Sequence, residues 1–247
     1  MREKGCLYII PNTIGNVQID SSIPVEVKHI INKLDYFIAE NEKKARSLIK
    51  LVSPNKLQNQ ISINVLNKYT SYNDSNAFLD VCLIGKSIGL ISDAGCPAIA
   101  DPGSSIICKA HNLKIKVRPL VGPSSIFLAL MSSGMNGQNF SFNGYLPIEK
   151  SERRKKIKFL EKKTLADNQS QIFMETPYRN NSLFKDLINT LSGSIKLCIA
   201  TDITLISENI KTKTIDQWKR IKSIDLNKRP TIFIIDSYQK SKKYKIV

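Results

Sequence analysis

The residues with the clearest potential for chemistry lie in one loop-like segment, from Leu90 to Gly103. It carries two carboxylates, Asp93 and Asp101, among two glycines and two prolines. Glycine admits positive φ and close backbone approach, and proline fixes φ and removes a donor, so the segment is stiff and its peptide groups are accessible. These residue types fit either a ligand-binding loop or a pair of tight turns, and by themselves they leave both readings open.

Four segments of the chain resemble the tetrapyrrole methylase superfamily, and especially its branch of ribosomal RNA small subunit methyltransferase I. Leu90 to Gly103 resembles the pattern V-S-D-A-G-T-P-x-I-S-D-P-G, with Cys96 where Thr is usual. The other three segments resemble L-Y-I-V-P-T-P-I-G-N, P-L-P-G-P-S/C-A and I-F-Y-E-S-P-H-R. They are Leu7 to Asn16, Pro119 to Ser125 and Ile172 to Arg179. Four matches in the order of the branch argue against a chance similarity.

The resemblance implies an α/β protein of two lobes, with S-adenosylmethionine folded into the cleft between them and held mainly by main-chain groups of these loops. Asp93 is the first candidate, because a carboxylate there can accept a hydrogen bond from the cofactor's amino group or ribose hydroxyls. A helix cap or turn acceptor is its alternative role. Carried onto this sequence, the implied cofactor contacts are Pro11, Asp93, Ala98, Ile99, Ser124, Ser125, Met174 and Thr231.

The resemblance also implies an acceptor, the ribose 2′-hydroxyl of a cytidine in the decoding region of small-subunit ribosomal RNA. A sugar hydroxyl is a poor nucleophile, so a base or an oriented acceptor should lie near the methyl group. Glu175 is the first candidate for a catalytic role, with Arg179 as phosphate clamp or as partner of that carboxylate. Glu40 resembles the first acid of the branch's A-E-D pattern, although Asn41 replaces the second. Asn16 ends the first motif and either orients the substrate or caps a helix.

The net charge of +16 at pH 7 indicates a polyanionic partner, since clustered Lys and Arg attract phosphates and release counterions. The densest cluster covers residues 150–163, where two acids interrupt the cations. A helix with Ile157 and Leu160 on a narrow apolar stripe fits this segment, and a solvated helix face is the alternative to RNA binding. The predicted RNA contacts of this cluster are Arg153, Arg154 and Lys155.

The sequence lacks the signals that are typical of several other classes of protein. The chain has no G-x-G-x-x-G and no G-x-x-x-x-G-K-[ST] motif, so dinucleotide and P-loop sites are without support. Its five cysteines are scattered without C-x-x-C spacing, and we expect reduced thiols and no metal. No apolar run approaches the roughly 18 residues of a membrane span, and the first residues do not resemble a signal peptide. We expect a cytoplasmic protein without a membrane partner, and the resemblance implies a homodimer.

Alternating strand and helix patterns predict an α/β fold in two lobes. A hinge near 145–150 would separate residues 1–146, with the D-A-G-C-P loop, from residues 147–247, with the basic helix and the M-E-T-P-Y-R segment. Residues 52–83 show few recognisable signals. The predicted strands cover 8–10, 36–39, 88–92, 114–118, 141–144, 171–174, 196–200 and 231–236. The predicted helices cover 27–34, 45–52, 104–111, 124–133, 150–163, 177–191 and 216–221.

Two other functions fit the resemblance. One is C-methylation of a tetrapyrrole in cobalamin or siroheme synthesis, whose enzymes usually open with a G-x-G-x-G loop that is absent here. The other is a non-catalytic RNA-binding relative, against which Glu175 and Arg179 argue. We predict an S-adenosylmethionine-dependent methyltransferase that acts on a ribose 2′-hydroxyl of small-subunit ribosomal RNA.

Overall fold

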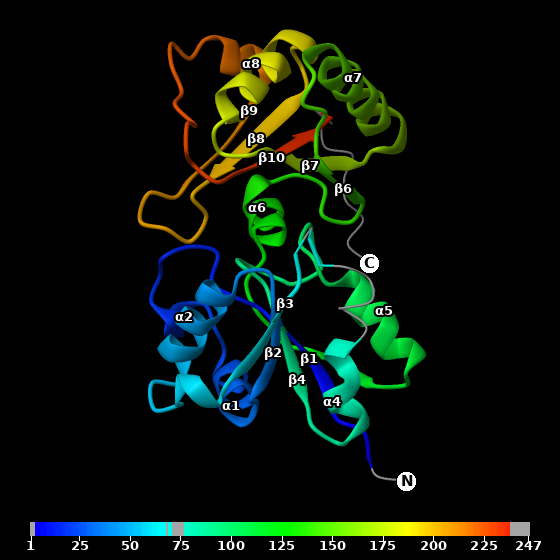
Figure 1. Cartoon of the computed structure of the whole chain (residues 1–247). Coiled ribbons are helices and arrows are strands. Elements are labelled where there is room, and N and C mark those ends of the chain that lie inside the picture. Colours follow the sequence, from blue (N-terminus) through cyan, green and yellow to red (C-terminus); the bar gives the residue numbers. More distant parts are fainter. Residues whose placement is uncertain (1–2, 68, 71–76, 238–247) are drawn as a thin grey trace, which may run out of the picture. The chain divides into compact units, whose positions relative to one another are not determined.

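Two compact units, Met1–Ser124 and Ser125–Val247, make up the chain. The structure is a computed structural model that describes residues 3–67, 69–70 and 77–237. Each unit is built on its own five-stranded sheet with helices packed on both faces (Figure 1). The predicted α/β class is therefore confirmed.

The sheet of the first unit, here called unit 1, is wholly parallel and has the order β3-β2-β4-β1-β5. Its central strands are almost entirely apolar, as strands covered by helices on both faces must be. The carboxyl ends of parallel strands lie at one edge of a sheet, so the loops that follow them share that edge. The strands are β1 (Cys6–Ile10), β2 (Tyr36–Ala39), β3 (Ser62–Val65), β4 (Ile88–Ile91) and β5 (Lys116–Pro119).

Alternate residues of this sheet point into two separate cores. Phe37 packs with α1 (Val25–Lys33) and α2 (Glu42–Val52) on one face. Its neighbour Ile38 packs on the other face, with α4 (Asp80–Leu83) and α5 (Ser104–Asn112). The period of two along a strand produces this division. Three short 3-10 helices complete the unit: η1 (Ile19–Ser21), η2 (Gln58–Gln60) and η3 (Ala77–Leu79).

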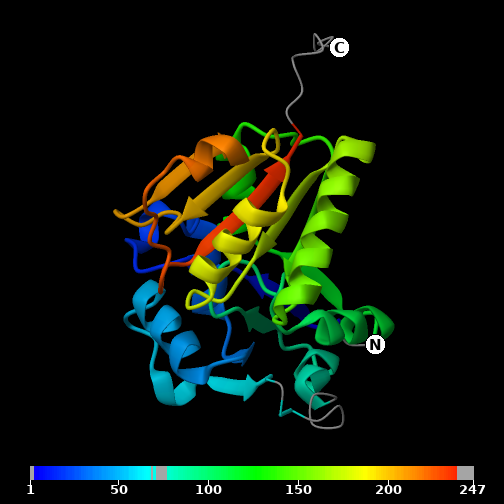
Figure 2. The ribbon, with the colours of Figure 1, turned by 90° about the horizontal axis from the view of Figure 1, so that it is seen from above.

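The sheet of the second unit, unit 2, is mixed and has the order β6-β7-β10-β8-β9. β6 is parallel to β7, and every other neighbouring pair is antiparallel. Figure 2 shows β10, in red, running through the middle of this sheet. The strands are β6 (Phe140–Tyr145), β7 (Ser170–Met174), β8 (Lys196–Thr201), β9 (Asn209–Thr214) and β10 (Thr231–Asp236).

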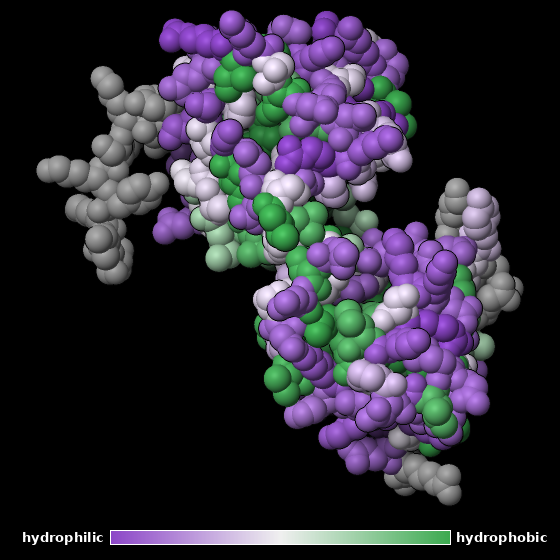
Figure 3. Space-filling model, turned by 90° about the vertical axis from the view of Figure 1, so that its left-hand side faces the viewer, coloured by the Kyte–Doolittle hydropathy of each residue, from purple (hydrophilic) through white to green (hydrophobic). Residues whose placement is uncertain are grey.

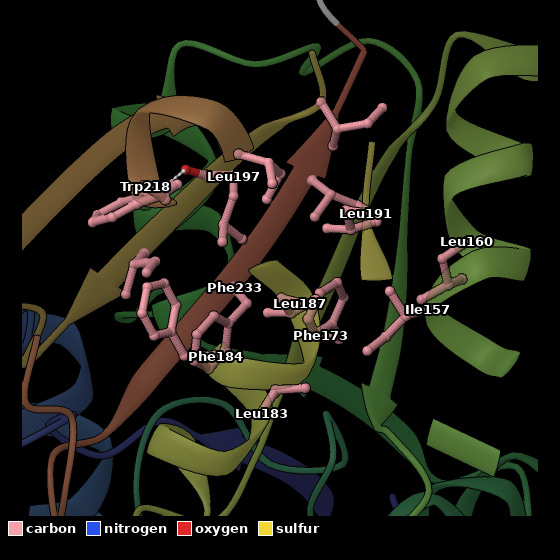
Figure 4. Packing of buried hydrophobic residues seen from close by; sticks show 14 of the residues in the cluster. Ile157, Leu160, Phe173, Leu183, Phe184, Leu187, Leu191, Leu197, Trp218 and Phe233 are labelled. Carbon is pink, nitrogen blue, oxygen red and sulfur yellow. Dashed lines mark hydrogen bonds between the residues drawn. The ribbon is translucent and has the colours of Figure 1, made fainter. Parts of the chain in front are cut away.

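The helices of unit 2 divide between the two faces of its sheet. α6 (Ser125–Ser133) packs against Ile172, Ile232 and neighbours of the same parity. α7 (Lys150–Asp167), α8 (Asn180–Thr190) and α9 (Ile215–Lys219) cover the opposite face. Figure 4 shows this second core, in which Phe173 and Phe233 lie between the helices and the indole of Trp218 donates to Leu197 O over 2.8 Å.

The division between the units falls between Ser124 and Ser125, earlier in the chain than the predicted boundary at 146/147. The reason is that β6 pairs with β7, and α6 packs on β8, β9 and β10, so both elements belong to the second sheet. Apart from the three 3-10 helices, the elements that were not predicted are β3, β9 and α4. β3 and α4 lie in or beside the stretch with few signals, and β9 is an edge strand composed mainly of Lys and Thr.

Candidate functional site

The loops that follow β1, β4 and β5 meet at the carboxyl edge of the parallel sheet in unit 1, where β1 lies between β4 and β5. A two-bond bridge joins the first two loops. Asn12 N donates to Gly95 O over 2.9 Å, and Gly95 N donates to Asn12 O over 3.1 Å. Gly95 has a φ of 68°, a conformation that glycine adopts without steric penalty. The bridge holds the first motif against the Asp93 loop.

The buried side chain of Asn12 strengthens this bridge. Its Nδ2 donates to Ser92 O over 3.1 Å and to Asp93 O over 3.3 Å. Ser92 Oγ donates to Gly95 O over 2.6 Å, so the turn is also closed on its own side. Sequence reasoning did not single out Asn12. The available signal was its place inside the first motif, where the branch pattern has Thr.

The third loop packs against the first through Gly122. A Cβ at Gly122 would lie 2.2 Å from Cγ of Pro11, so only glycine allows this approach. Cys96 Sγ donates to Pro123 O over 3.4 Å and joins the third loop to the second. Pro11, a predicted cofactor contact, is buried, and its ring is the surface against which Gly122 rests.

The next turn of the second loop has an unusual backbone. Ala98 and Ala100 have φ values of 64° and 56°, although neither is glycine. Such strained residues persist where the surroundings determine them, and they cluster at functional sites. Ile99 lies between them with 54% of its surface exposed. The two predicted contacts Ala98 and Ile99 are therefore on an accessible, conformationally fixed turn.

Acidic side chains gather at the same edge. Asp93 Oδ2 pairs with Lys44 Nζ over 2.8 Å, and Asp93 is not a helix cap. Burial and the charges of Glu40 and Asp93 raise the pKa of Asp101 to about 6, although Lys44 acts in the opposite direction. Glu40 and Asp93 line a pocket of about 700 Å³ that reaches the first turn of α5 at Ser104. A pocket of several hundred Å³ can hold a small organic ligand.

A second group of predicted residues lies at one edge of the sheet in unit 2. Glu175 directly follows β7, and its side chain has 0% of its surface exposed. Its Oε1 accepts from Arg179 Nη2 over 2.6 Å and from Thr176 N over 2.7 Å. Among the described residues, Glu175 Oε2 and Arg179 Nε have no hydrogen-bond partner. Burying such atoms costs free energy, and a bound ligand can recover it.

Met174 and Thr231 lie beside this carboxylate in the fold. β7 and β10 are antiparallel with Met174 opposite Ile232, so the end of β7 and the start of β10 share an edge. Thr231 is buried, and its hydroxyl donates to Arg229 O over 2.9 Å. Glu175, Arg179, Met174 and Thr231 are thus brought together within unit 2.

The remaining predicted residues of the loops are more dispersed. Ser124 ends unit 1, and Ser125 begins α6 of unit 2. Asn16 is exposed and caps no helix, since Gln18 is the N-cap of the following 3-10 helix. Glu40 is exposed at the rim of the acidic pocket.

One predicted RNA contact on the basic helix α7, Arg153, is wrong. Arg153 is only 4% exposed, and its Nε donates to Asp186 Oδ2 over 2.8 Å, so it is a buried ion pair and not a surface cation. It precedes Ile157 by one turn and therefore continues the buried stripe. Arg154 and Lys155 do lie on the exposed side, paired with Asp186 and Glu152.

Within residues 3–67, 69–70 and 77–237, no three His, Cys, Asp or Glu side chains are arranged to hold a metal ion. In that same part of the chain, no helix combines the length and the apolar composition that crossing a membrane requires.

Known proteins resemble this chain over most of its length, although no family model matches it. The ribosomal RNA small subunit methyltransferase I of Buchnera aphidicola subsp. Schizaphis graminum is 31% identical over 245 residues, which cover 98% of this chain and 82% of the relative. The protein of the same name from Vibrio cholerae is 29% identical over 211 residues, 83% of this chain and 67% of the relative. That from Escherichia coli O157:H7 is 28% identical over 207 residues, 84% and 68% of the two chains.

Among solved structures, the methyltransferase CobJ superposes with a TM-score of 0.63, over 94% of this chain and 94% of its own. The sequence identity is 10%, so this likeness concerns the fold alone. It confirms the predicted α/β fold of the tetrapyrrole methylase type.

The contact between Gly122 and Pro11 can be tested by adding one methyl group. We expect Gly122→Ala to force the first and third loops apart, at a cost of about 1–3 kcal/mol. The midpoint of thermal unfolding should fall by roughly 2–4 °C for each kcal/mol. Gly137→Ala is the control, because a Cβ there meets nothing within 4 Å. Equal midpoints for the two variants would contradict the proposed contact between the loops.

The burial of Asp101 predicts a pH-dependent stability. Its pKa is raised from 3.8 to about 6, so the native state favours the protonated form and loses stability as pH rises through that interval. Asp101→Asn removes this loss. The variant should therefore melt at a higher temperature than the parent above pH 6, with an advantage that shrinks towards pH 3.8. Thermal unfolding across this range measures it, with the exposed Asp80→Asn as control. An advantage that does not vary with pH would show that Asp101 titrates normally.

Proposed function

The chain belongs to the family of ribosomal RNA small subunit methyltransferase I and is therefore a methyltransferase, and we propose that it transfers a methyl group from S-adenosylmethionine to a ribose 2′-hydroxyl of small-subunit ribosomal RNA. Relatives named for that RNA align with 83% to 98% of this chain. As part of the same proposal, the enzyme acts in the cytoplasm, where ribosomal subunits are assembled, and works as a homodimer.

The observation that carries the proposal is the joined set of loops after β1, β4 and β5. The Asn12–Gly95 bridge and the Gly122–Pro11 contact fix these loops before any ligand binds. A preorganised loop edge binds a small ligand without the entropic cost of ordering the chain. It also presents peptide groups, which suit a cofactor that carries both an amino-acid end and a nucleoside.

The residues present fit S-adenosylmethionine. Asp93 Oδ2 is paired with Lys44, and Oδ1 has no hydrogen-bond partner among the described residues, so it can accept from an amino group or a ribose hydroxyl. The strained turn at Ala98 and Ile99 offers main-chain groups in fixed directions. We assign the cofactor contacts to these residues together with Pro11, Ser124, Ser125, Met174 and Thr231.

The cofactor supplies an activated methyl group on a positively charged sulfur, so the protein's task is to align donor and acceptor. Glu175 has one oxygen held by Arg179 and Thr176 and one oxygen without a partner. That second oxygen can accept the hydrogen bond of the acceptor hydroxyl and later its proton. The arrangement supports Glu175 as the catalytic residue and Arg179 as the group that fixes its orientation.

The half-exposed guanidinium of Arg179 has a second role available. Its side chain is 35% exposed, so the exposed part of the guanidinium can also contact a phosphate of the RNA. Arg154, Lys155, Glu40 and Asn16 are kept as substrate-side candidates because all four are exposed. No observation favours a tetrapyrrole substrate, since the likeness to CobJ extends only to the fold.

The proposed roles of Asp93 and Glu175 predict two different kinetic defects. Asp93→Asn should weaken S-adenosylmethionine binding at least about tenfold, a change of roughly 1.4 kcal/mol. Glu175→Gln should leave that affinity unchanged and lower kcat by about 10²–10⁴, the usual contribution of acid–base catalysis. The measurements are calorimetric titration with S-adenosylmethionine and transfer of tritiated methyl to small ribosomal subunits that lack the modification.

The exposed Asp80→Asn serves as the control for loss of a carboxylate. A nucleotide-resolution map of 2′-O-methylation then identifies the acceptor. Absence of cofactor binding by the parent protein would reject the donor assignment, and label found only in porphyrinoids would reject the RNA substrate.

A further inference from the structure

A second basic surface lies in unit 2, away from α7 and outside the residues assigned above to catalysis. It is formed by β9, α9 and the segment that leads to β10, and we call it the β9–α9 surface. Residues 209–229 contain seven cations and two acids. Five of the cations are exposed, and Lys213 and Arg229 are partly exposed. The seven cations are Lys211, Lys213, Lys219, Arg220, Lys222, Lys228 and Arg229.

The strand register explains why two of these lysines act together. Lys211 lies opposite Ile199 and Lys213 opposite Leu197, and both apolar partners belong to the core that α9 covers. Side chains two apart on a strand point to the same face. Lys211 and Lys213 therefore project beside α9. They lie at the edge of the sheet, because β9 is its last strand among the described residues.

A recess of about 410 Å³ opens within this surface. The apolar side chains of Ile199 and Trp218 line it. Its polar lining includes three cations, one acid and a hydroxyl: Lys211, Lys213, Arg229, Asp225 and Ser223. Figure 3 views the molecule from this side and shows unit 2 with mainly hydrophilic residues and a few hydrophobic ones between them. The recess thus combines several positive charges with hydroxyl and amide groups in a defined space.

Of the seven cations of this surface, Arg229 pairs with an acid, its Nε lying 2.8 Å from Asp202 Oδ2. Among the described residues, no ion pair involves Lys211, Lys213, Lys219, Arg220, Lys222 or Lys228. On α7, by contrast, four cations are paired with acids. Unpaired like charges repel one another, and a polyanion relieves that repulsion while releasing its counterions.

We propose that the β9–α9 surface binds the phosphate backbone of the RNA acceptor, with one phosphate and its ribose seated in the recess between Lys211, Lys213 and Arg229. This inference rests on the proposed function, because it assumes an RNA substrate. RNA is the favoured partner because a compact recess with converging cations suits a phosphate, and side-chain hydroxyl and amide groups suit the sugar. The surface positions the RNA and leaves the chemistry to other residues.

The test removes three positive charges and keeps unbranched, polar side chains that are one atom shorter. The variant carries Lys211→Gln, Lys213→Gln and Lys222→Gln, and the matched control carries Lys33→Gln, Lys50→Gln and Lys116→Gln, which are exposed in unit 1. Filter binding with deproteinised small-subunit ribosomal RNA over a series of KCl concentrations gives the number of phosphate contacts. Each lost contact should reduce the slope of log K against log salt by about 0.7–0.9.

For the three substitutions we expect the slope to fall by roughly 2. The KM for RNA should rise at least tenfold, with kcat and the affinity for S-adenosylmethionine unchanged. A slope and a KM equal to those of the control would overturn the proposal. So would normal binding of deproteinised RNA combined with lost activity on assembled subunits, because that result would assign the surface to an acidic protein.

These outcomes remain distinct from failure of the proposed function. If the parent protein methylates no ribosomal RNA, the function itself is wrong. If the parent is active and the variant resembles the control, only the docking surface is wrong.

Discussion

The hydrogen-bonded bridge between Asn12 and Gly95 is the constraint on which the candidate site depends. Loops at the carboxyl edge of a parallel sheet are free to diverge unless something joins them, and here the join is made by main-chain groups. The Asn12 amide, the Gly122–Pro11 contact and the Cys96 thiol extend it to all three loops. The outcome is a fixed edge on which Asp93 and the strained alanines hold their positions, as a small charged cofactor requires.

Much of this arrangement could be predicted from the sequence. β2 was expected at the residues where it occurs, because an uninterrupted apolar run suits a strand buried on both faces. The loop motifs identified the edge itself. β9 was not predicted, because an edge strand of Lys and Thr lacks an apolar pattern. The boundary between the units lies earlier than predicted, because α6 and β6 pack on the second sheet. Tertiary contacts determine whether such a strand forms and to which sheet an element belongs, and these contacts cannot be read from a single sequence.

The burial of charged side chains was also only partly predictable from the sequence. Arg153 and Arg154 are neighbours in sequence, yet one is buried against Asp186 and the other remains at the surface. Composition counts both equally, whereas only the exposed Arg154 is within reach of a phosphate. The raised pKa of Asp101 likewise arises from burial, from Glu40 after β2 and from Asp93 in the same loop. The spacing from Arg153 to Ile157 carried a signal of burial, but nothing in the sequence marked Asp101 as perturbed.

The preformed loop edge can be tested by a crystal structure of the protein with S-adenosylmethionine. We expect the cofactor to contact the main chain between Asp93 and Ile99 and the Asn12–Gly95 bridge to persist unchanged, because the edge is formed before the ligand arrives. A cofactor bound elsewhere, or a bridge that opens to admit it, would show that the loops are not a preformed binding edge.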